Sequence, residues 1–203
     1  MSIERLLLGT SNPAKIDEWK RLIGDIVELV PAEEMGIESP KEKGGSFKEI
    51  AENKAKYYAK KTKLFVLSED GGFEIDAMDG LPGIKSRRIL PGDKEGSDED
   101  LISFVIKRLE GVPDEKRGAR LTVHVVISDP EGKIVFEKKG SIEGRIPQEA
   151  TSDYEKGYPY RAVLYVKEAG KIFSRFEKED YEKHGHRKPI AESIREFLLE
   201  YDR

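Results

Sequence analysis

Two adjacent acidic residues, Glu69 and Asp70, lie one residue after an apolar stretch that predicts a buried strand. The stretch covers residues 64–67, and two glycines, Gly71 and Gly72, come directly after the acids. Neighbouring carboxylates repel each other and are costly to hold together without a counter-charge, which Mg²⁺ with a polyphosphate supplies. Glycine lets a ligand approach the backbone closely. The pattern indicates a cation site at the end of a strand, with an ordinary acidic turn as the alternative.

Composition excludes several classes of protein. The chain has 203 residues, which is enough to bury a sizeable core, and it contains no cysteine, which excludes disulfides and thiolate metal sites. Its net charge of −4 argues against a broad surface for a nucleic-acid polymer. No apolar run reaches membrane-spanning length, and the first residues lack a signal-peptide pattern. We therefore expect a soluble, cytoplasmic protein without a membrane partner.

Strand and helix patterns alternate along the chain, and they include both parallel and hairpin connections. They predict an α/β or α+β fold. Helices are expected after Pro13, over residues 47–61 and 98–109, and at the C-terminal end, and the run from Ser97 to Asp100 is expected to cap the third of them. Strands are expected at residues 5–8, 26–30, 64–67, 73–77, 121–127, 133–138, 141–146 and 162–166.

The first strand leads into a helix through a polar loop. Asn12 is a good N-cap, and Pro13 suits the first helical position. The free N–H groups and dipole of a helix N-terminus attract phosphate, and Thr10, Ser11 and Lys15 add two hydroxyls and a cation. The spacing of a Walker A loop is absent. The loop is either a phosphate site or a simple helix cap.

A second helix opens with the capping-box pair Ser46 and Glu49. Lys54 falls inside the apolar stripe of this helix, where a lysine either extends its amine to water or meets an anion. Glu49, together with Glu69 and Asp70, offers three carboxylates for Mg²⁺, which would leave positions for phosphate oxygens and water. Glu49 is therefore a metal ligand or a helix cap, and one residue can do either.

Aromatic and basic residues gather in the last third of the chain. Tyr158 and Tyr160 lie in a Gly/Pro loop and either stack on a base or only pack. His186 and Arg187 precede the last helix and can donate hydrogen bonds to a nucleobase carbonyl. A metal site at His184 and His186 lacks a further acidic or histidine partner nearby.

Taken in order, these segments resemble the inosine triphosphate pyrophosphatase family over nearly the whole chain. Residues 10–18 are similar to the family's T-x-N-x-x-K-x-x-E pattern, and Ser46, Phe47, Glu49 and Lys54 to its second motif. Residues 69–73 and 80–86 resemble E/D-D-S-G-L and G-x-P-G-x-Y-S, and His186-Arg187 matches the end of S-H-R. Each motif is weak alone, but their shared order and spacing are specific.

The resemblance implies a fold, an activity and partners. The fold is α/β, an elongated mixed sheet flanked by helices, in a single domain over residues 1–203 with two lobes and a central cleft. The activity is Mg²⁺-dependent hydrolysis of nucleoside triphosphates, in particular non-canonical purine ones, to the monophosphate and pyrophosphate. Members are usually homodimers.

The resemblance also assigns roles to residues. Catalysis falls to Asp70, as base for the attacking water, with Glu69 and Lys15, and the metal ligands are Glu49, Glu69 and Asp70. The substrate-binding positions are Thr10, Ser11, Asn12, Lys15, Lys54, Gly71, Tyr158, His186 and Arg187. Within this set Tyr158 stacks on the base, while His186 and Arg187 read its edge.

The positions that depart from the family pattern are concentrated where the resemblance places the nucleobase. Gly71 stands for a Ser or Thr, Gly185 for the Ser of S-H-R and Arg161 for an acid. Tyr181 stands for a lysine, unless a small shift of the alignment brings in Lys183. We therefore hypothesise that triphosphate chemistry is retained while base preference has drifted. The alternatives are a nucleotide-binding or regulatory protein with little turnover, and a purely structural role.

Overall fold

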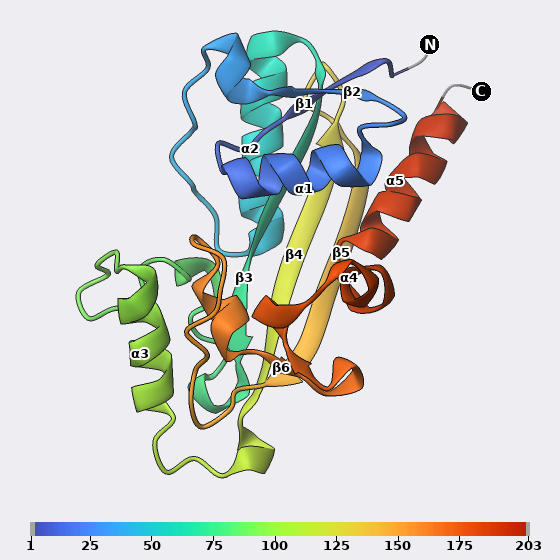
Figure 1. Cartoon of the computed structure of the whole chain (residues 1–203). Coiled ribbons are helices and arrows are strands. Elements are labelled where there is room, and N and C mark those ends of the chain that lie inside the picture. Colours follow the sequence, from blue (N-terminus) through green and yellow to red (C-terminus); the bar gives the residue numbers. More distant parts are fainter. Residues whose placement is uncertain (1–2, 202–203) are drawn as a thin grey trace. The chain divides into compact units, whose positions relative to one another are not determined.

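The structure, a computed structural model, describes residues 3–201 (Figure 1). Its helices are α1 (Pro13–Ile23), α2 (Phe47–Thr62), α3 (Asp98–Arg108), α4 (Lys178–His184) and α5 (Lys188–Tyr201). Its strands are β1 (Arg5–Leu8), β2 (Glu28–Pro31), β3 (Phe65–Ile75), β4 (Gly118–Ser128), β5 (Ile134–Arg145), β6 (Tyr165–Val166) and β7 (Lys171–Ile172). Within this part of the chain, no helix has the length and apolar character needed to cross a membrane.

The strands form a seven-stranded sheet in the order β2-β1-β3-β4-β5-β6-β7. β1 is parallel to β2 and β3, whereas β6 is antiparallel to β5 and β7, so the sheet is mixed and the predicted α/β class is confirmed. The chain divides into two compact units. The first unit holds residues 3–70, 123–140 and 187–201, and the second holds residues 71–122 and 141–186.

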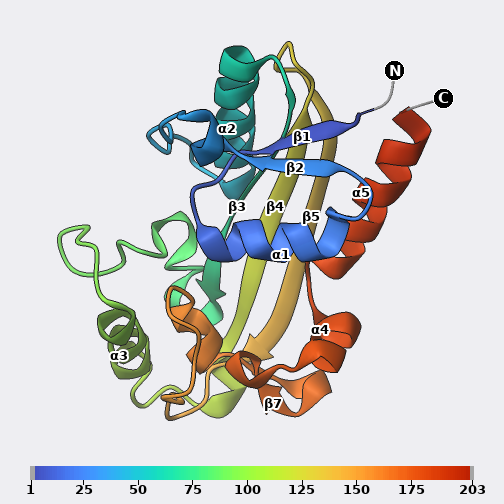
Figure 2. The ribbon, with the colours of Figure 1, turned by 45° about the horizontal axis from the view of Figure 1, so that its top comes forward.

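Helices cover both faces of the sheet in the first unit. Leu6 and Leu8 pack with α1 and α5, whereas Leu7, which points to the other face, packs with α2. Figure 2 shows α1 and α5 side by side against the strands. Since both faces are buried, β1 is a continuous apolar run rather than an alternating one.

The order β2-β1-β3 places the two strands that follow β1 in the chain on opposite sides of it. In open α/β sheets, ligands bind at such a reversal, beside the carboxyl ends of the strands. β1 ends at Leu8, which pairs with Leu67 of β3. The loop into α1 and the acids after Leu67 therefore lie at the expected place for a ligand.

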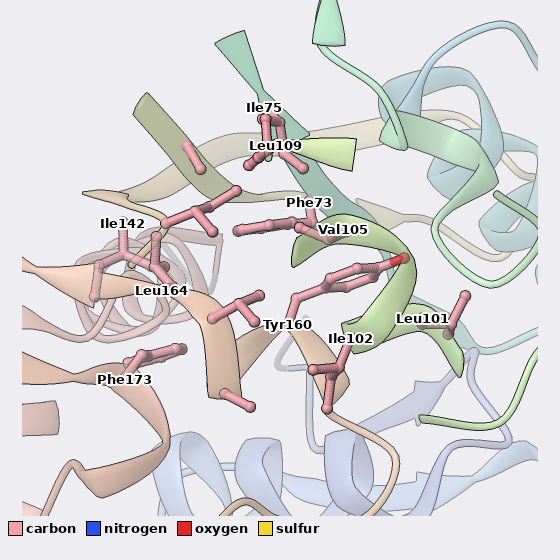
Figure 3. Close-up of a cluster of buried hydrophobic side chains, with 14 of the residues drawn as sticks. Phe73, Ile75, Leu101, Ile102, Val105, Leu109, Ile142, Tyr160, Leu164 and Phe173 are labelled. Atoms are coloured by element: carbon pink, nitrogen blue, oxygen red, sulfur yellow. The ribbon is translucent and has the colours of Figure 1, made fainter. Parts of the chain in front are cut away.

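The second unit has its own apolar core, which Figure 3 shows around Phe73 and Tyr160. These two rings stack with a centroid distance of 4.8 Å, and Leu101 and Val105 of α3 pack in the same cluster. The predicted capping box at Ser97 is confirmed, because its hydroxyl accepts the Asp100 N–H while the Asp100 carboxylate accepts the Ser97 N–H.

The prediction that a strand ends before Glu69 is wrong. β3 continues through both acids and both glycines to Ile75, so the separate strand expected at residues 73–77 is part of it. The strand that ends at this point is the neighbouring β1, which pairs with β3 only as far as Leu67. Strand β3 continues because β4 still pairs with it on the other side.

Two further expectations are corrected. The segments 133–138 and 141–146 belong largely to one strand, β5, because the two residues between them, Lys139 and Gly140, continue the strand. The apolar residues of segment 162–166 are largely buried, but most of the segment is not a strand. Pro159 begins a 3₁₀ helix (Pro159–Val163) there, as a proline at a first helical position favours, and only the two residues of β6 pair in the sheet.

Candidate active site

The loop before α1 is fixed by local hydrogen bonds. Asn12 caps the helix, since its side chain accepts the Ala14 N–H at 3.0 Å, and the Thr10 hydroxyl accepts the Asn12 N–H at 3.2 Å. Gly9 is needed for close packing, because a Cβ there would lie 3.0 Å from the Tyr58 ring. The predicted cap is thus confirmed, and the N-terminus of α1 is held at the carboxyl end of β1.

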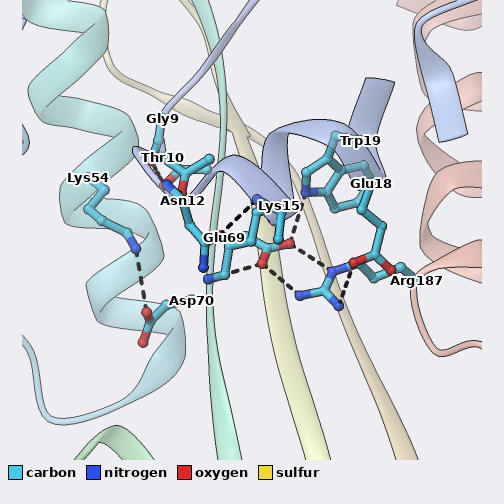
Figure 4. A network of polar contacts seen from close by, with 12 residues as sticks. Gly9, Thr10, Asn12, Lys15, Glu18, Trp19, Lys54, Glu69, Asp70 and Arg187 are labelled. Atoms are coloured by element: carbon cyan, nitrogen blue, oxygen red, sulfur yellow. Dashed lines mark hydrogen bonds and ion pairs between the residues drawn. The ribbon is translucent and has the colours of Figure 1, made fainter. Parts of the chain in front are cut away.

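Glu69 is the centre of a buried polar network, shown in Figure 4. Its Oε1 accepts from Lys15 Nζ at 3.1 Å and from Arg187 Nη2 at 2.8 Å. Its Oε2 accepts from Trp19 Nε1 at 2.9 Å and from Arg187 Nε at 3.1 Å. Arg187 Nη1 also lies 3.3 Å from Glu18 Oε2. One carboxylate therefore fixes two cations and an indole.

This network decides the charge state of Glu69. Burial by itself would raise the pKa of the Glu69 carboxyl, but the charges of Arg187 and Lys15 and their hydrogen bonds outweigh burial and hold it well below its usual range. A carboxylate has about four lone-pair sites, and the contacts above use all of them. In this arrangement Glu69 can take a metal ion only by giving up one of these donors.

Asp70 has a different environment from its neighbour. Its Oδ1 lies 3.4 Å from Lys54 Nζ, and the same Nζ lies 3.4 Å from the carboxylate of Glu42. Lys54 therefore contacts anionic groups although it lies in the apolar stripe of α2, which is one of the two alternatives that the sequence left open. Burial raises the pKa of Asp70, the nearby charge of Glu42 adds to this effect, and Lys54 and Lys15 oppose it. Asp70 is thus a buried carboxylate with one long ion pair.

Glu49 lies at the start of α2 as expected, although its capping differs from the prediction. The Ser46 hydroxyl accepts the Glu49 N–H at 3.2 Å, but the Glu49 carboxylate accepts the N–H of Gly45, at 2.7 Å, in place of that of Ser46. Among residues 3–201, no group of three or more His, Asp or Glu side chains is arranged to hold a metal ion. The structure does not bring Glu49, Glu69 and Asp70 together into one such group.

The aromatic residues of the second unit surround a buried cation. The Arg161 guanidinium carbon lies 3.7 Å from the centre of the Tyr158 ring and 5.2 Å from that of Phe173. Arg161 Nη1 donates to the Tyr181 hydroxyl and to Glu155 Oε2, each at 3.1 Å. Arg161 therefore covers one face of the tyrosine that the resemblance assigns to base stacking.

The predicted site residues divide between the two units. The first unit contains Thr10, Ser11, Asn12, Lys15, Glu49, Lys54, Glu69, Asp70 and Arg187, and the second contains Gly71, Tyr158 and His186. His186 is buried, with its ring centre 6.1 Å from that of Phe173. Contacts connect Lys15, Glu69 and Arg187 in one network, and Lys54 with Asp70 in another.

Three residues of these networks were not among the predicted site residues: Glu18, Trp19 and Glu42. Glu18 and Trp19 follow Lys15 by three and four residues, a spacing that puts all three on one side of α1. That spacing could have identified Glu18 and Trp19 as neighbours of Lys15 in the site. Glu42 lies in a polar loop, where no comparable pattern indicates its contact with Lys54.

The sheet order and the charged groups beside the first helix are typical of α/β proteins that bind phosphorylated ligands. The chain belongs to the Ham1 family, whose sequence profile matches residues 6–197. The resemblance to inosine triphosphate pyrophosphatases is thereby confirmed.

Relatives and solved structures agree with this assignment. A dITP/XTP pyrophosphatase of Yersinia pestis is 32% identical over 91% of this chain and 93% of its own, and one of Thermus thermophilus is 31% identical over 97% and 91%. A HAM1 protein from Coxiella burnetii superimposes with a TM-score of 0.83 at 26% identity, covering 97% of this chain and 98% of that one. The Ham1 protein of Staphylococcus aureus gives a TM-score of 0.80, also at 26% identity, over 98% and 100%.

Proposed function

We propose that this protein is a Mg²⁺-dependent pyrophosphatase that hydrolyses non-canonical purine nucleoside triphosphates to the monophosphate and pyrophosphate. The relatives named dITP/XTP pyrophosphatase support the reaction and the substrate class. The observation that carries the proposal is Asp70, a buried carboxylate with a raised pKa and a single long ion pair, next to a lysine. Such perturbed groups are typical of general bases.

The residues of the first unit account for the chemistry. The triphosphate needs its charge neutralised while water breaks the bond between the α- and β-phosphoryl groups. Lys15, Lys54 and the N–H groups at the start of α1 supply positive charge, and a phosphate would compete with Glu42 for Lys54. Asp70 accepts the proton of the attacking water. Glu69 acts through Lys15 and Arg187, whose positions it fixes.

We expect Mg²⁺ to bind together with the substrate, whose phosphate oxygens would complete its coordination. Mg²⁺ in nucleotide enzymes is commonly held by one or two carboxylates and completed by phosphate oxygens and water. Asp70 and Glu49 would be those carboxylates, whereas the donors around Glu69 make it a poorer ligand than first expected. When bound, the ion would neutralise phosphate charge and polarise the anhydride.

A panel of nucleoside triphosphates with Mg²⁺, assayed for pyrophosphate release, tests the proposal. XTP, ITP and dITP should yield pyrophosphate well above ATP, GTP, CTP and UTP. If a nucleotide binds tightly but none is hydrolysed, the protein is a nucleotide-binding relative with little turnover. If none raises the melting temperature, every nucleotide role fails, because a ligand of the native state stabilises it.

Glu49→Gln separates a metal ligand from a helix cap. We expect the Mg²⁺ concentration for half-maximal activity to rise at least about tenfold, because a ligand is lost, while the melting temperature changes little. Ser46→Ala is the control: it should destabilise the start of α2 by about 1 kcal/mol and leave the Mg²⁺ dependence unchanged. A change in melting temperature alone in Glu49→Gln would assign Glu49 to the cap.

The resemblance also supports a homodimer, and the composition supports a cytoplasmic location. Sedimentation equilibrium of the purified protein tests the oligomeric state directly.

A further inference from the structure

Trp19 is the neutral donor among the contacts of Glu69 that Figure 4 shows. Its ring is fully buried in an apolar core of the first unit, and its Nε1 lies 2.9 Å from Glu69 Oε2. The other donors to this carboxylate, Lys15 and Arg187, are cations. A leucine or phenylalanine would also bury apolar surface in this core, but it would bring no N–H that needs an acceptor. Packing alone therefore does not require the hydrogen bond to Glu69.

Lys15 and Trp19 lie about one helical turn apart on α1 and reach different oxygens of Glu69. Lys15 Nζ lies 3.1 Å from Oε1, whereas the indole donates to Oε2. The two oxygens share one negative charge by resonance, so a hydrogen bond at Oε2 lowers the negative charge at Oε1. The N–H of Trp19 therefore weakens the attraction between Glu69 and Lys15. All three residues belong to the first unit.

The ion pair between Lys15 and Glu69 is accessible on the lysine side. The Lys15 side chain is 18% exposed, whereas that of Glu69 is fully buried. In the proposed function the triphosphate uses the charge of Lys15, so it competes with Glu69 for this amine. Electrostatic interactions are strong in such a site, because little water screens them. A modest change in the attraction between Glu69 and Lys15 thus changes the free energy of triphosphate binding.

We infer that Trp19 is a positioning residue of the proposed reaction: through Glu69, its indole N–H determines how readily Lys15 leaves the carboxylate for a phosphate group. The inference rests on the proposed function, in which Lys15 meets the triphosphate. Without the N–H, Glu69 holds Lys15 more tightly and the triphosphate binds more weakly.

A tryptophan analogue tests this contact at a single atom. Trp19 is the sole tryptophan, so growth of a tryptophan auxotroph on benzothienylalanine replaces the indole N–H with sulfur at this position only. The dissociation constant of the α,β-imido analogue of ITP, measured with Mg²⁺ by isothermal titration calorimetry, should rise about threefold to tenfold, because Glu69 loses a hydrogen bond to its charge. Trp19→Phe removes the donor without placing sulfur against the carboxylate, and it should change the affinity in the same direction.

Lys15→Met shows whether the effect passes through the lysine. In that background the sulfur analogue and the tryptophan protein should bind the imido nucleotide equally, because the charge on which Trp19 acts is gone. A contact that only stabilises the fold would weaken binding by the same factor in both backgrounds. Chemical denaturation gives a second measurement without nucleotide: Lys15→Met should destabilise the sulfur analogue more than the tryptophan protein, since the ion pair is tighter there.

Tyr58→Phe is the matched control. Tyr58 is also a buried aromatic donor of the first unit, but its hydroxyl donates to the neutral Ser39 Oγ, at 3.2 Å, so its loss should leave the affinity unchanged. Wild-type affinity in folded Trp19 variants, or equal losses with and without Lys15, overturns the inference. If the wild-type protein binds no triphosphate, the proposed function has failed, and that result is seen before any variant is made.

Discussion

Replacing Asp70 with asparagine should lower kcat about 10²–10⁴-fold, which is the usual contribution of a general base. The melting temperature should stay the same or rise at neutral pH. Burial raises the pKa of Asp70, so the ionised form is less favourable in the folded protein than in the unfolded chain, and a neutral isostere relieves that cost. Steady-state pyrophosphate release and thermal unfolding of the same preparation measure both effects.

Asp17→Asn provides the matched control for this substitution. Asp17 is an exposed aspartate of α1 in the same unit, and removal of its charge should change neither kcat nor stability appreciably. A folded Asp70→Asn protein with wild-type turnover would remove Asp70 from the mechanism.

The pH dependence of the wild-type enzyme follows from the same carboxyl. Proton transfer from water requires Asp70 in its ionised form, and its pKa is raised. Activity should therefore be lost on acidification at a higher pH than for an ordinary aspartate. A pH–rate profile for kcat/KM, which reports the free enzyme, measures this acidic limb, and the limb should be missing from any residual activity of Asp70→Asn.

Glu69→Gln should cause the largest loss of stability. The substitution leaves the buried Arg187 and the partly buried Lys15 beside a neutral amide, and breaking one side of a buried ion pair costs about 3–5 kcal/mol. Activity should fall as well, since both cations lose the group that fixes them. Chemical denaturation with a two-state fit measures the stability change.

An exposed pair of the same geometry provides the control. Arg5 donates from Nε and Nη2 to the two carboxylate oxygens of Glu28, at 3.0 and 2.9 Å, as Arg187 does to Glu69, but the pair lies on the surface. Glu28→Gln should change stability little because solvent screens that pair. If both substitutions have the same effect, burial of the Glu69 network is not what makes it stabilising.

The stability contribution of Glu69 has a defined pH window. Its pKa in the folded state is depressed, so the contribution is fully present above the ordinary glutamate pKa, 4.5, and declines as the pH falls below it. The difference in stability between wild type and Glu69→Gln should therefore shrink on acidification. A constant difference would indicate that packing rather than charge stabilises the site.

Features set by local geometry could be predicted from the sequence. The caps at Asn12 and Ser97 depend on residues two or three positions away, and both were predicted correctly. The anion beside Lys54 was one of the two alternatives indicated by the place of that lysine in an apolar stripe. These predictions succeed because helix periodicity and capping act over a few residues.

Features set by tertiary pairing could not be predicted. Strand β3 continues past Leu67 because β4 still pairs with it, and nothing within residues 64–72 reveals that partner. The donors around Glu69 include Arg187, which is 118 residues away in the sequence. The motifs identified both residues, but only the structure shows that they bind each other.

The hydrogen bond from Trp19 to Glu69 gives the protein a built-in optical probe. Trp19 is the sole tryptophan of the chain, so indole fluorescence originates from one buried ring. Its emission depends on the field of the carboxylate and of the two cations around it. A triphosphate that draws Lys15 or Arg187 away would change that emission, which makes the arrival of unlabelled nucleotide visible in a stopped-flow fluorimeter.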